Sequence, residues 1–170
     1  MHDGGVMESE LWGRLFLDLS VRVEWLTQAL EGVPSDEAGA ARLRDYARSL
    51  AELHGALERV DAHRSDPRLA PLFTLEGPLA GYLSRLYAWC DEIGEDLERM
   101  AAALRRGQPT SVVFSFHAVT RSYAHFDEMV GSIRRRLCVE RVCPRFDQHL
   151  EELIWANEWL HMTLARAPGA

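Results

Sequence analysis

The chain has 170 residues, close to the usual size of one domain, and its apolar and charged fractions are 47% and 26%. These globular proportions exclude a disordered chain, a collagen-like repeat and a disulfide scaffold. The net charge is −7, and all 19 basic residues are arginine. An acidic chain gives little support to a general nucleic-acid binder, because such proteins are usually basic. Abundant Ala and Arg and the lack of Lys indicate a GC-rich bacterial genome.

The sequence also predicts where the protein acts. It contains no stretch of about 18 uncharged apolar residues, so we expect no membrane span. The first ten residues lack the basic and apolar regions of a signal peptide. Cys90, Cys138 and Cys143 are an odd number of cysteines, which favours reduced thiols over a disulfide framework. We therefore expect a cytoplasmic protein that does not bind membranes.

Apolar residues recur in alternating steps of four and three along almost the whole chain, which is typical of helices with heptad-like apolar seams. We expect an all-α fold, an up-down bundle of four to five long antiparallel helices in a single domain of residues 1–170. The predicted helices cover, in chain order, about residues 8–31, 36–61, 78–106, 111–138 and 145–166.

The first predicted helix, about 8–31, has a seam that runs from Trp12 to Leu30. The second, about 36–61, has its seam at Leu43, Tyr46, Leu50, Leu53, Leu57 and Val60. The segment 62–77 follows and combines two prolines with several Leu and Phe residues. We expect it to be an irregular loop that caps one end of the bundle.

The third predicted helix, about 78–106, begins at Pro78 and stops before Gly107, both favoured at those positions. The fourth, about 111–138, is apolar from Val112 to Leu137. The fifth, about 145–166, has Asn157 at a seam position. A single buried Asn in a seam can fix the register of packed helices at some cost in stability.

The seams carry no carboxylate or histidine, and the sequence has no glycine-rich nucleotide loop or nucleophile elbow. We therefore expect no catalytic activity, no cofactor and no metal ion. One alternative is that histidines beside the seams converge on a metal, because imidazole is a common ligand. These histidines are His54, His117, His125, His149 and His161.

Arg48 and His54 have the Arg-x5-His spacing, which resembles the motif of HEPN ribonucleases, a family of helical bundles. The resemblance covers only these two residues, and the position after the arginine is Ser49, where the family prefers an amide or an acid. It implies that Arg48 contacts the scissile phosphate and His54 transfers a proton, with two subunits contributing two copies. A HEPN-like ribonuclease is therefore a second alternative.

Charge is unevenly distributed along the predicted bundle. An acidic belt lies on the third predicted helix, at Asp91, Glu92, Glu95, Asp96 and Glu98. Up-down connectivity would gather His63 and eight arginines at one end, which we call the arginine pole. Its arginines are Arg59, Arg64, Arg68, Arg134, Arg135, Arg136, Arg141 and Arg145. A small helical subunit that contacts RNA or DNA through this pole is a third alternative.

The leading hypothesis is a non-catalytic adaptor or small accessory subunit of a bacterial multi-protein system. Trp155, Trp159 and Met162 recur at helical spacing beside the last seam, and Trp and Met are enriched in protein interfaces. We expect these three residues to form an apolar contact with a protein partner, or with a second copy of the chain. Four residues of the pole would add a charged contact: Arg134, Arg135, Arg136 and Arg141.

Overall fold

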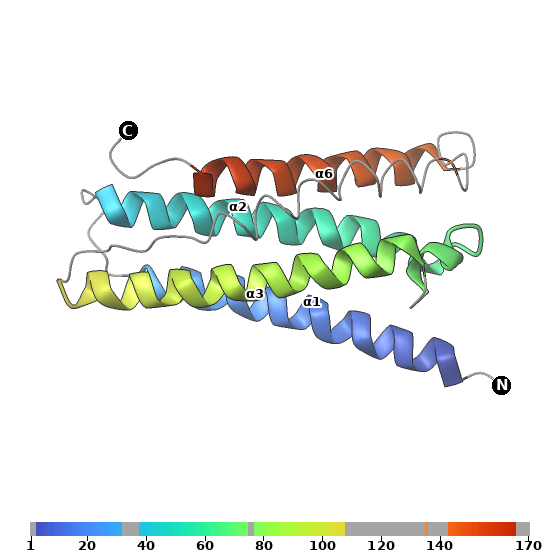
Figure 1. Cartoon of the computed structure of the whole chain (residues 1–170), viewed down its shortest axis with the longest axis horizontal. Helices are drawn as coiled ribbons and strands as arrows, with labels where there is room; N and C mark the ends of the chain where they lie inside the picture. Colours follow the sequence, from blue (N-terminus) through green and yellow to red (C-terminus); the bar gives the residue numbers. More distant parts are fainter. Residues whose placement is uncertain (1–2, 32–37, 75–76, 108–134, 136–142, 166–170) are drawn as a thin grey trace.

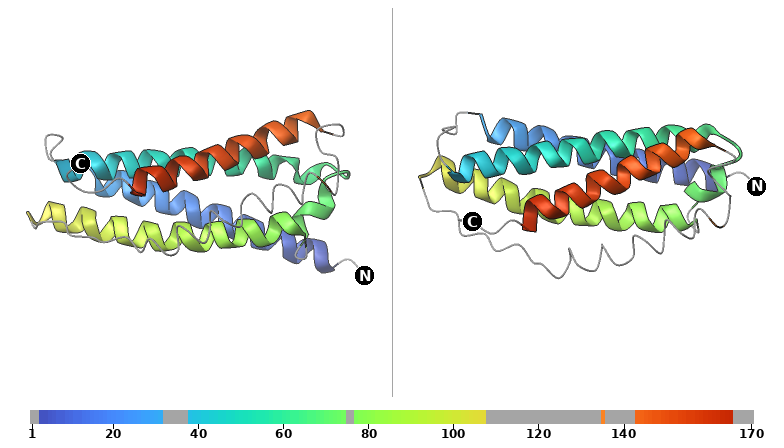
Figure 2. Two further views of the ribbon diagram at one scale, coloured as in Figure 1. Left: turned by 45° about the horizontal axis from the view of Figure 1, so that its top comes forward. Right: turned by 90° about the horizontal axis from the view of Figure 1, so that it is seen from above.

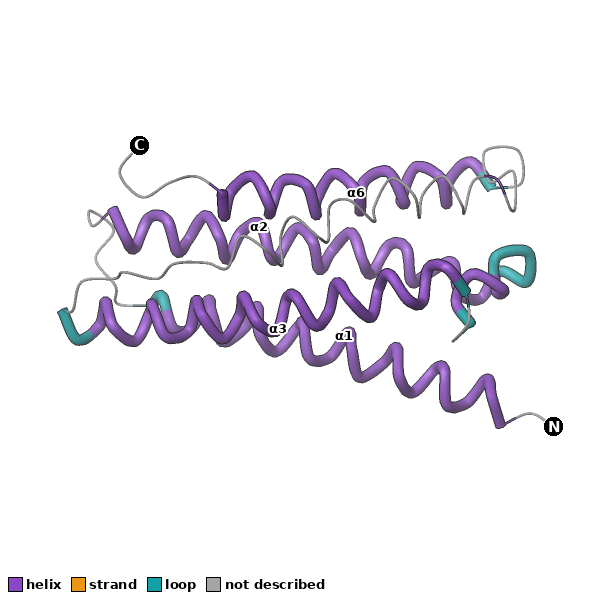
Figure 3. The backbone as a smooth tube through the Cα atoms, in the orientation of Figure 1, coloured by secondary structure: helices purple, strands orange, loops and turns teal. Residues whose placement is uncertain are grey.

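The computed structural model describes residues 3–31, 38–74, 77–107, 135 and 143–165, and within these residues every element is helical and no strand occurs (Figure 3). Four long helices are described, with two short 3-10 helices between the second and the third. Their bounds are α1 Asp3–Ala29, α2 Ala38–Asp61, η1 Ala62–Ser65, η2 Ala70–Phe73, α3 Pro78–Arg105 and α6 Pro144–Ala165. The helix predicted at 111–138 lies outside the described residues, except for Arg135, which is helical and exposed.

The long helices lie side by side, with α2 between α6 and the pair formed by α1 and α3 (Figure 1). α2 packs most extensively against α6, and α1 packs most extensively against α3. The chain direction along α2 is opposite to that along α1, α3 and α6 (Figures 1 and 2). The end of α2, the start of α3 and the start of α6 therefore lie at the same end of the molecule.

The apolar seams of α2 and α6 are buried in the core. The buried seam residues of α2 are Leu43, Tyr46, Leu50, Leu53, Leu57 and Val60. Those of α6 are Phe146, Leu150, Leu153 and Leu160. Full burial of each such side chain stabilises the fold by about 1.5–3 kcal/mol before the cost in chain entropy. Burial of one complete stripe on each helix fixes which face of α2 meets α6.

Asn157 is buried within this core, at 1% exposure, on the same stripe as the seam residues of α6. Its Oδ1 atom has no hydrogen-bond partner among the described residues. A buried carbonyl without a partner costs about 1–3 kcal/mol. The chain therefore keeps an amide here at a cost in stability.

The corner between α2 and α3 covers the end of the core. η1 and η2 fold back so that Leu69, Leu72 and Phe73 are buried. The ring of Phe73 meets the ring of Phe146 edge to face, with centroids 6.3 Å apart. Segment 62–77, expected to be irregular, thus contains two helical turns that seal the apolar end of α6.

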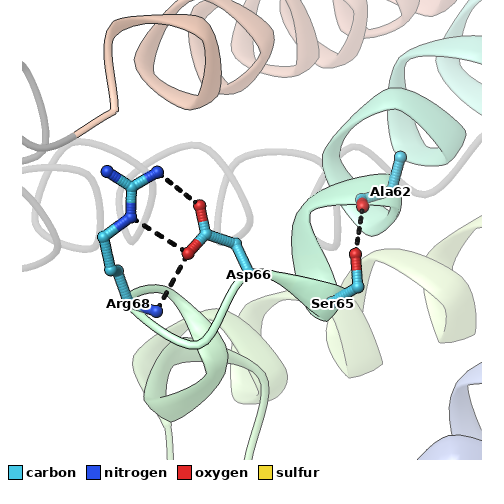
Figure 4. Close-up of polar contacts among 4 residues, drawn as sticks. All are labelled: Ala62, Ser65, Asp66 and Arg68. Atoms are coloured by element: carbon cyan, nitrogen blue, oxygen red, sulfur yellow. Dashed lines mark hydrogen bonds and ion pairs between the residues drawn. The ribbon is translucent and has the colours of Figure 1, made fainter.

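A polar turn follows η1 and orders this corner (Figure 4). Arg68 donates three hydrogen bonds to the carboxylate of Asp66: from its backbone N at 3.0 Å, from Nε at 3.1 Å and from Nη2 at 2.7 Å. These side-chain and backbone hydrogen bonds lower the pKa of Asp66 to about 2. Ser65 Oγ donates to the carbonyl of Ala62 at 3.4 Å.

Arg22 joins α1 to the acidic belt of α3. Its guanidinium lies 3.5 Å from Asp91, 3.6 Å from Glu95 and 3.0 Å from Glu98. Burial alone would lower the pKa of Arg22, but the hydrogen bond to Glu98 and the three negative charges raise it. A large part of the acidic belt therefore stabilises the contact between α1 and α3.

Candidate partner-binding face

Trp155, Trp159 and Met162 lie at positions i, i+4 and i+7 of α6 and form one stripe, which we call the tryptophan face. Trp155 is 63% exposed and Met162 is 53% exposed, while Trp159 is half-buried. The two indole rings stack, with centroids 5.8 Å apart and planes inclined by 14°. The face therefore consists of a stacked aromatic pair and Met162, with Trp155 and Met162 exposed to solvent.

A groove runs between α2 and α6 along the tryptophan face. It consists of two adjoining hollows of about 610 and 410 Å³, which share Arg48, Glu52 and Trp155 in their walls. The wall from α6 contains Trp155 and Ala156 together with Glu152, and the facing wall from α2 carries Arg48, Glu52 and Arg59. One ion pair lies within α2, with Arg48 Nη1 3.5 Å from Asp45, and another joins the two helices, with Arg59 Nε 3.0 Å from Glu152.

A buried polar contact fixes the helices beneath the groove. Ser49 Oγ donates to Thr163 Oγ1 at 3.4 Å, and Thr163 Oγ1 donates to the carbonyl of Trp159 at 2.8 Å. Ser49 and Thr163 are both buried. Because this chain of hydrogen bonds ends on the backbone of Trp159, it ties one tryptophan of the face to α2.

α1 also exposes large apolar side chains, namely Leu17 and Trp25. Trp25 lies beneath Arg22, whose guanidinium carbon is 5.6 Å from the ring centroid. A cation above an indole face contributes about 0.5–1 kcal/mol at an exposed site. Trp25 thus has a structural role next to the carboxylates of α3, in contrast to the stacked pair on α6.

The arginines of the predicted pole are only partly described. Arg134, Arg136 and Arg141 lie outside the described residues, and Arg135 is exposed. Three other arginines of the pole each pair with a carboxylate: Arg59 with Glu152, Arg64 with Asp61 and Arg68 with Asp66. The described part of the pole is therefore largely neutralised by local ion pairs.

Arg48 and His54 lie on different sides of α2. Six residues at 3.6 residues per turn separate them by about 120° around the helix axis. Arg48 is exposed in the groove, whereas His54 is half-buried with its Nε2 3.4 Å from Glu58. Among the described residues, these two side chains are not brought together at one site.

Two of the five histidines that could converge on a metal ion have described side chains. The side chains of His54 and His149 are described, and each lies beside a different partner, Glu58 and His63. His117 and His125 lie outside the described residues. Within the described residues, no three His, Cys, Asp or Glu side chains are grouped so that they could hold a metal ion.

Cys90 and Cys143 are buried free thiols, and burial raises the pKa of Cys90.

None of the helices in the described ranges combines the length and the apolar character that a membrane crossing requires. No protein-family model, curated protein or solved structure matches the chain.

Proposed function

We propose that the chain is a non-catalytic helical adaptor or small accessory subunit that binds a protein partner through the tryptophan face. The observation that carries this proposal is the exposure of Trp155, at 63%, within a stacked pair. A large aromatic ring in water forgoes the free energy of burying its apolar surface, about 25 cal/mol per Å². A partner that covers the ring would recover it.

The surroundings of the face support binding rather than a flat solvated surface. Trp and Met are enriched at protein interfaces, which usually have an apolar centre and a polar rim. Here Arg48 and Glu52 line the facing wall of the groove. Stacking already orders the two rings, so less side-chain freedom is lost on association.

The spacing of the face favours a helical partner. Trp155, Trp159 and Met162 follow the i, i+4, i+7 spacing by which helices contact each other. We propose that an amphipathic helix of the partner lies along α6 and places its charged flanks against α2. For the whole chain we propose the up-down bundle that the seams predict, supported by the alternating directions of α1, α2 and α3. We also propose a cytoplasmic, bacterial setting, on the composition of the sequence.

Photocrosslinking in bacterial cells tests the proposal. Benzoylphenylalanine replaces Met162, and in a matched control it replaces Glu92, which is exposed on α3. We expect a discrete adduct from position 162 whose second component is a different protein, and no such adduct from position 92. Trp155→Ala should remove the adduct and leave the helical circular dichroism spectrum unchanged.

Three results would contradict the proposal. One is the same set of adducts from positions 162 and 92. Another is an adduct from position 162 that contains only two copies of this chain. The third is unfolding of Trp155→Ala with the adduct retained in the folded fraction, which would make Trp155 a core residue.

A further inference from the structure

A pair of histidines joins the corner after α2 to the start of α6. His63 Nε2 lies 2.8 Å from His149 Nδ1, which is a direct hydrogen bond between the rings. The ring of His63 also meets the ring of Phe146 edge to face, with centroids 5.2 Å apart and planes at 81°. The pair is therefore fixed against the buried end of α6.

The two histidines line a hollow of about 570 Å³, together with Arg59, Arg145 and Gln148. This volume is within the range of roughly 300–1,000 Å³ that is usual for small-molecule sites. The described residues in its wall include two arginines and no carboxylate. Arg59 uses its Nε on Glu152, whereas Arg145 is exposed in the first turn of α6.

We propose that this hollow binds a phosphoryl group, carried by inorganic phosphate or by a small phosphate monoester, between Arg145 and the histidine pair. An arginine fork matches two phosphate oxygens. The Nε2 atom of Gln148 donates to Glu152 Oε1 at 3.4 Å, and its second N–H adds a neutral donor. The first turn of a helix also favours an anion, because its N–H groups have no partners within the helix. In α6 this turn begins at Pro144, which has no N–H, and it contains Asp147, whose negative charge opposes an anion. The site lies towards the opposite end of α6 from Met162, and it shares Arg59 with the wall of the groove along the tryptophan face.

The histidine pair couples this site to pH. In the neutral pair one ring donates to the other, which leaves one further N–H and one further lone pair on the two rings. Burial lowers the pKa of His63, the positive charges of His149 and Arg145 lower it further, and Asp66 opposes them. Besides Arg145 and the histidines, the wall of the hollow contains one more basic residue, Arg59. The carboxylate of Asp66 is paired with Arg68. A bound dianion would favour the protonated pair, so binding should strengthen as the pH falls.

Histidine NMR signals provide the test, with sulfate as the first probe. Sulfate remains a dianion over the useful pH range, so any dependence on pH arises from the protein. At constant ionic strength, we expect sulfate to shift the signals of His63 and His149 and to bind about tenfold more tightly at pH 6 than at pH 8. Arg145→Gln should weaken binding about tenfold, whereas Arg105→Gln, the same charge change at the far end of α3, should not alter it.

Two further probes identify the ligand. Tighter binding of glycerol phosphate than of inorganic phosphate supports a monoester, and the reverse order supports the free ion. The proposal is overturned if sulfate shifts the histidine signals no more than chloride does. It is also overturned if Arg145→Gln and Arg105→Gln bind sulfate equally. Arg145 is exposed, so its variant should remain folded, which circular dichroism would verify.

Discussion

Gly77 immediately precedes α3, where the chain passes close to the backbone of η2. A Cβ atom added at this position would lie 2.6 Å from the carbonyl oxygen of Leu72 and 2.7 Å from that of Pro71. Both contacts are with backbone, so no side chain can rotate away to relieve them. Gly77→Ala must therefore displace either η2 or the start of α3.

Gly77→Ala should lower the free energy of unfolding. Overpacking of this kind destabilises the fold by about 1–3 kcal/mol. Alanine also reduces the conformational entropy of the unfolded chain, which stabilises the fold by about 0.4–1 kcal/mol. We expect a net destabilisation of about 1–2 kcal/mol. For a chain of this length, the melting temperature should fall by about 2–8 °C.

Gly81→Ala is the matched control, because it is the same substitution four residues further along α3. Gly81 is exposed and an added Cβ would meet nothing within 4 Å. Alanine is favoured over glycine within a helix by about 1 kcal/mol, so this variant should be more stable than the parent chain. Urea unfolding followed by circular dichroism measures both variants. Changes of the same sign in both, with equal m-values, would refute the reasoning.

Three further changes test other contacts by urea unfolding. Arg22→Met leaves three neighbouring carboxylates without their cation, so we expect a loss of about 1 kcal/mol at low salt and a smaller loss in 1 M NaCl; equal losses would contradict the electrostatic role. Gly107 has φ of +70°, so Gly107→Ala should cost about 1 kcal/mol, and unchanged stability would disprove the strain. The pKa of His63 is lowered below 6.5 in the folded chain, so the unfolded chain binds the proton more readily. The contribution of His63 to the free energy of unfolding is therefore complete above about pH 6.5 and declines as the pH falls below that value. In chloride buffers, His63→Gln should make the free energy of unfolding depend less on pH in this range. An unchanged pH profile would exclude His63 as its source.

The helical secondary structure and the core residues could be predicted from the sequence, because both depend on local periodicity. The seam of α2 is buried from Leu43 to Val60, and Asn157 is buried at the position that the heptad steps indicate. The sequence also placed Trp155 beside the seam, and its ring is exposed in the structure. The described parts of the fold are therefore all-α, as periodicity predicts.

The contacts that define the sites depend on distances between helices, which periodicity does not contain. Arg22 is 76 residues from Glu98, and His63 is 86 residues from His149. Both pairs meet because of the relative height of two helices, and the seam residues constrain that height only to about one turn. The short sequence spacing of Asp61 with Arg64 and of Asp66 with Arg68 was the available signal that these two arginines of the pole are neutralised locally.

The stacking of Trp155 and Trp159 has an optical consequence. Two indoles at 5.8 Å are close enough for their excited states to couple, and this coupling would give the chain a distinctive near-ultraviolet circular dichroism band. An exposed indole also emits at a longer wavelength than a buried one, so Trp155 and Trp25 should both contribute to the red edge of the fluorescence spectrum. The same pair of rings therefore provides an unlabelled signal that would change whenever the tryptophan face is covered.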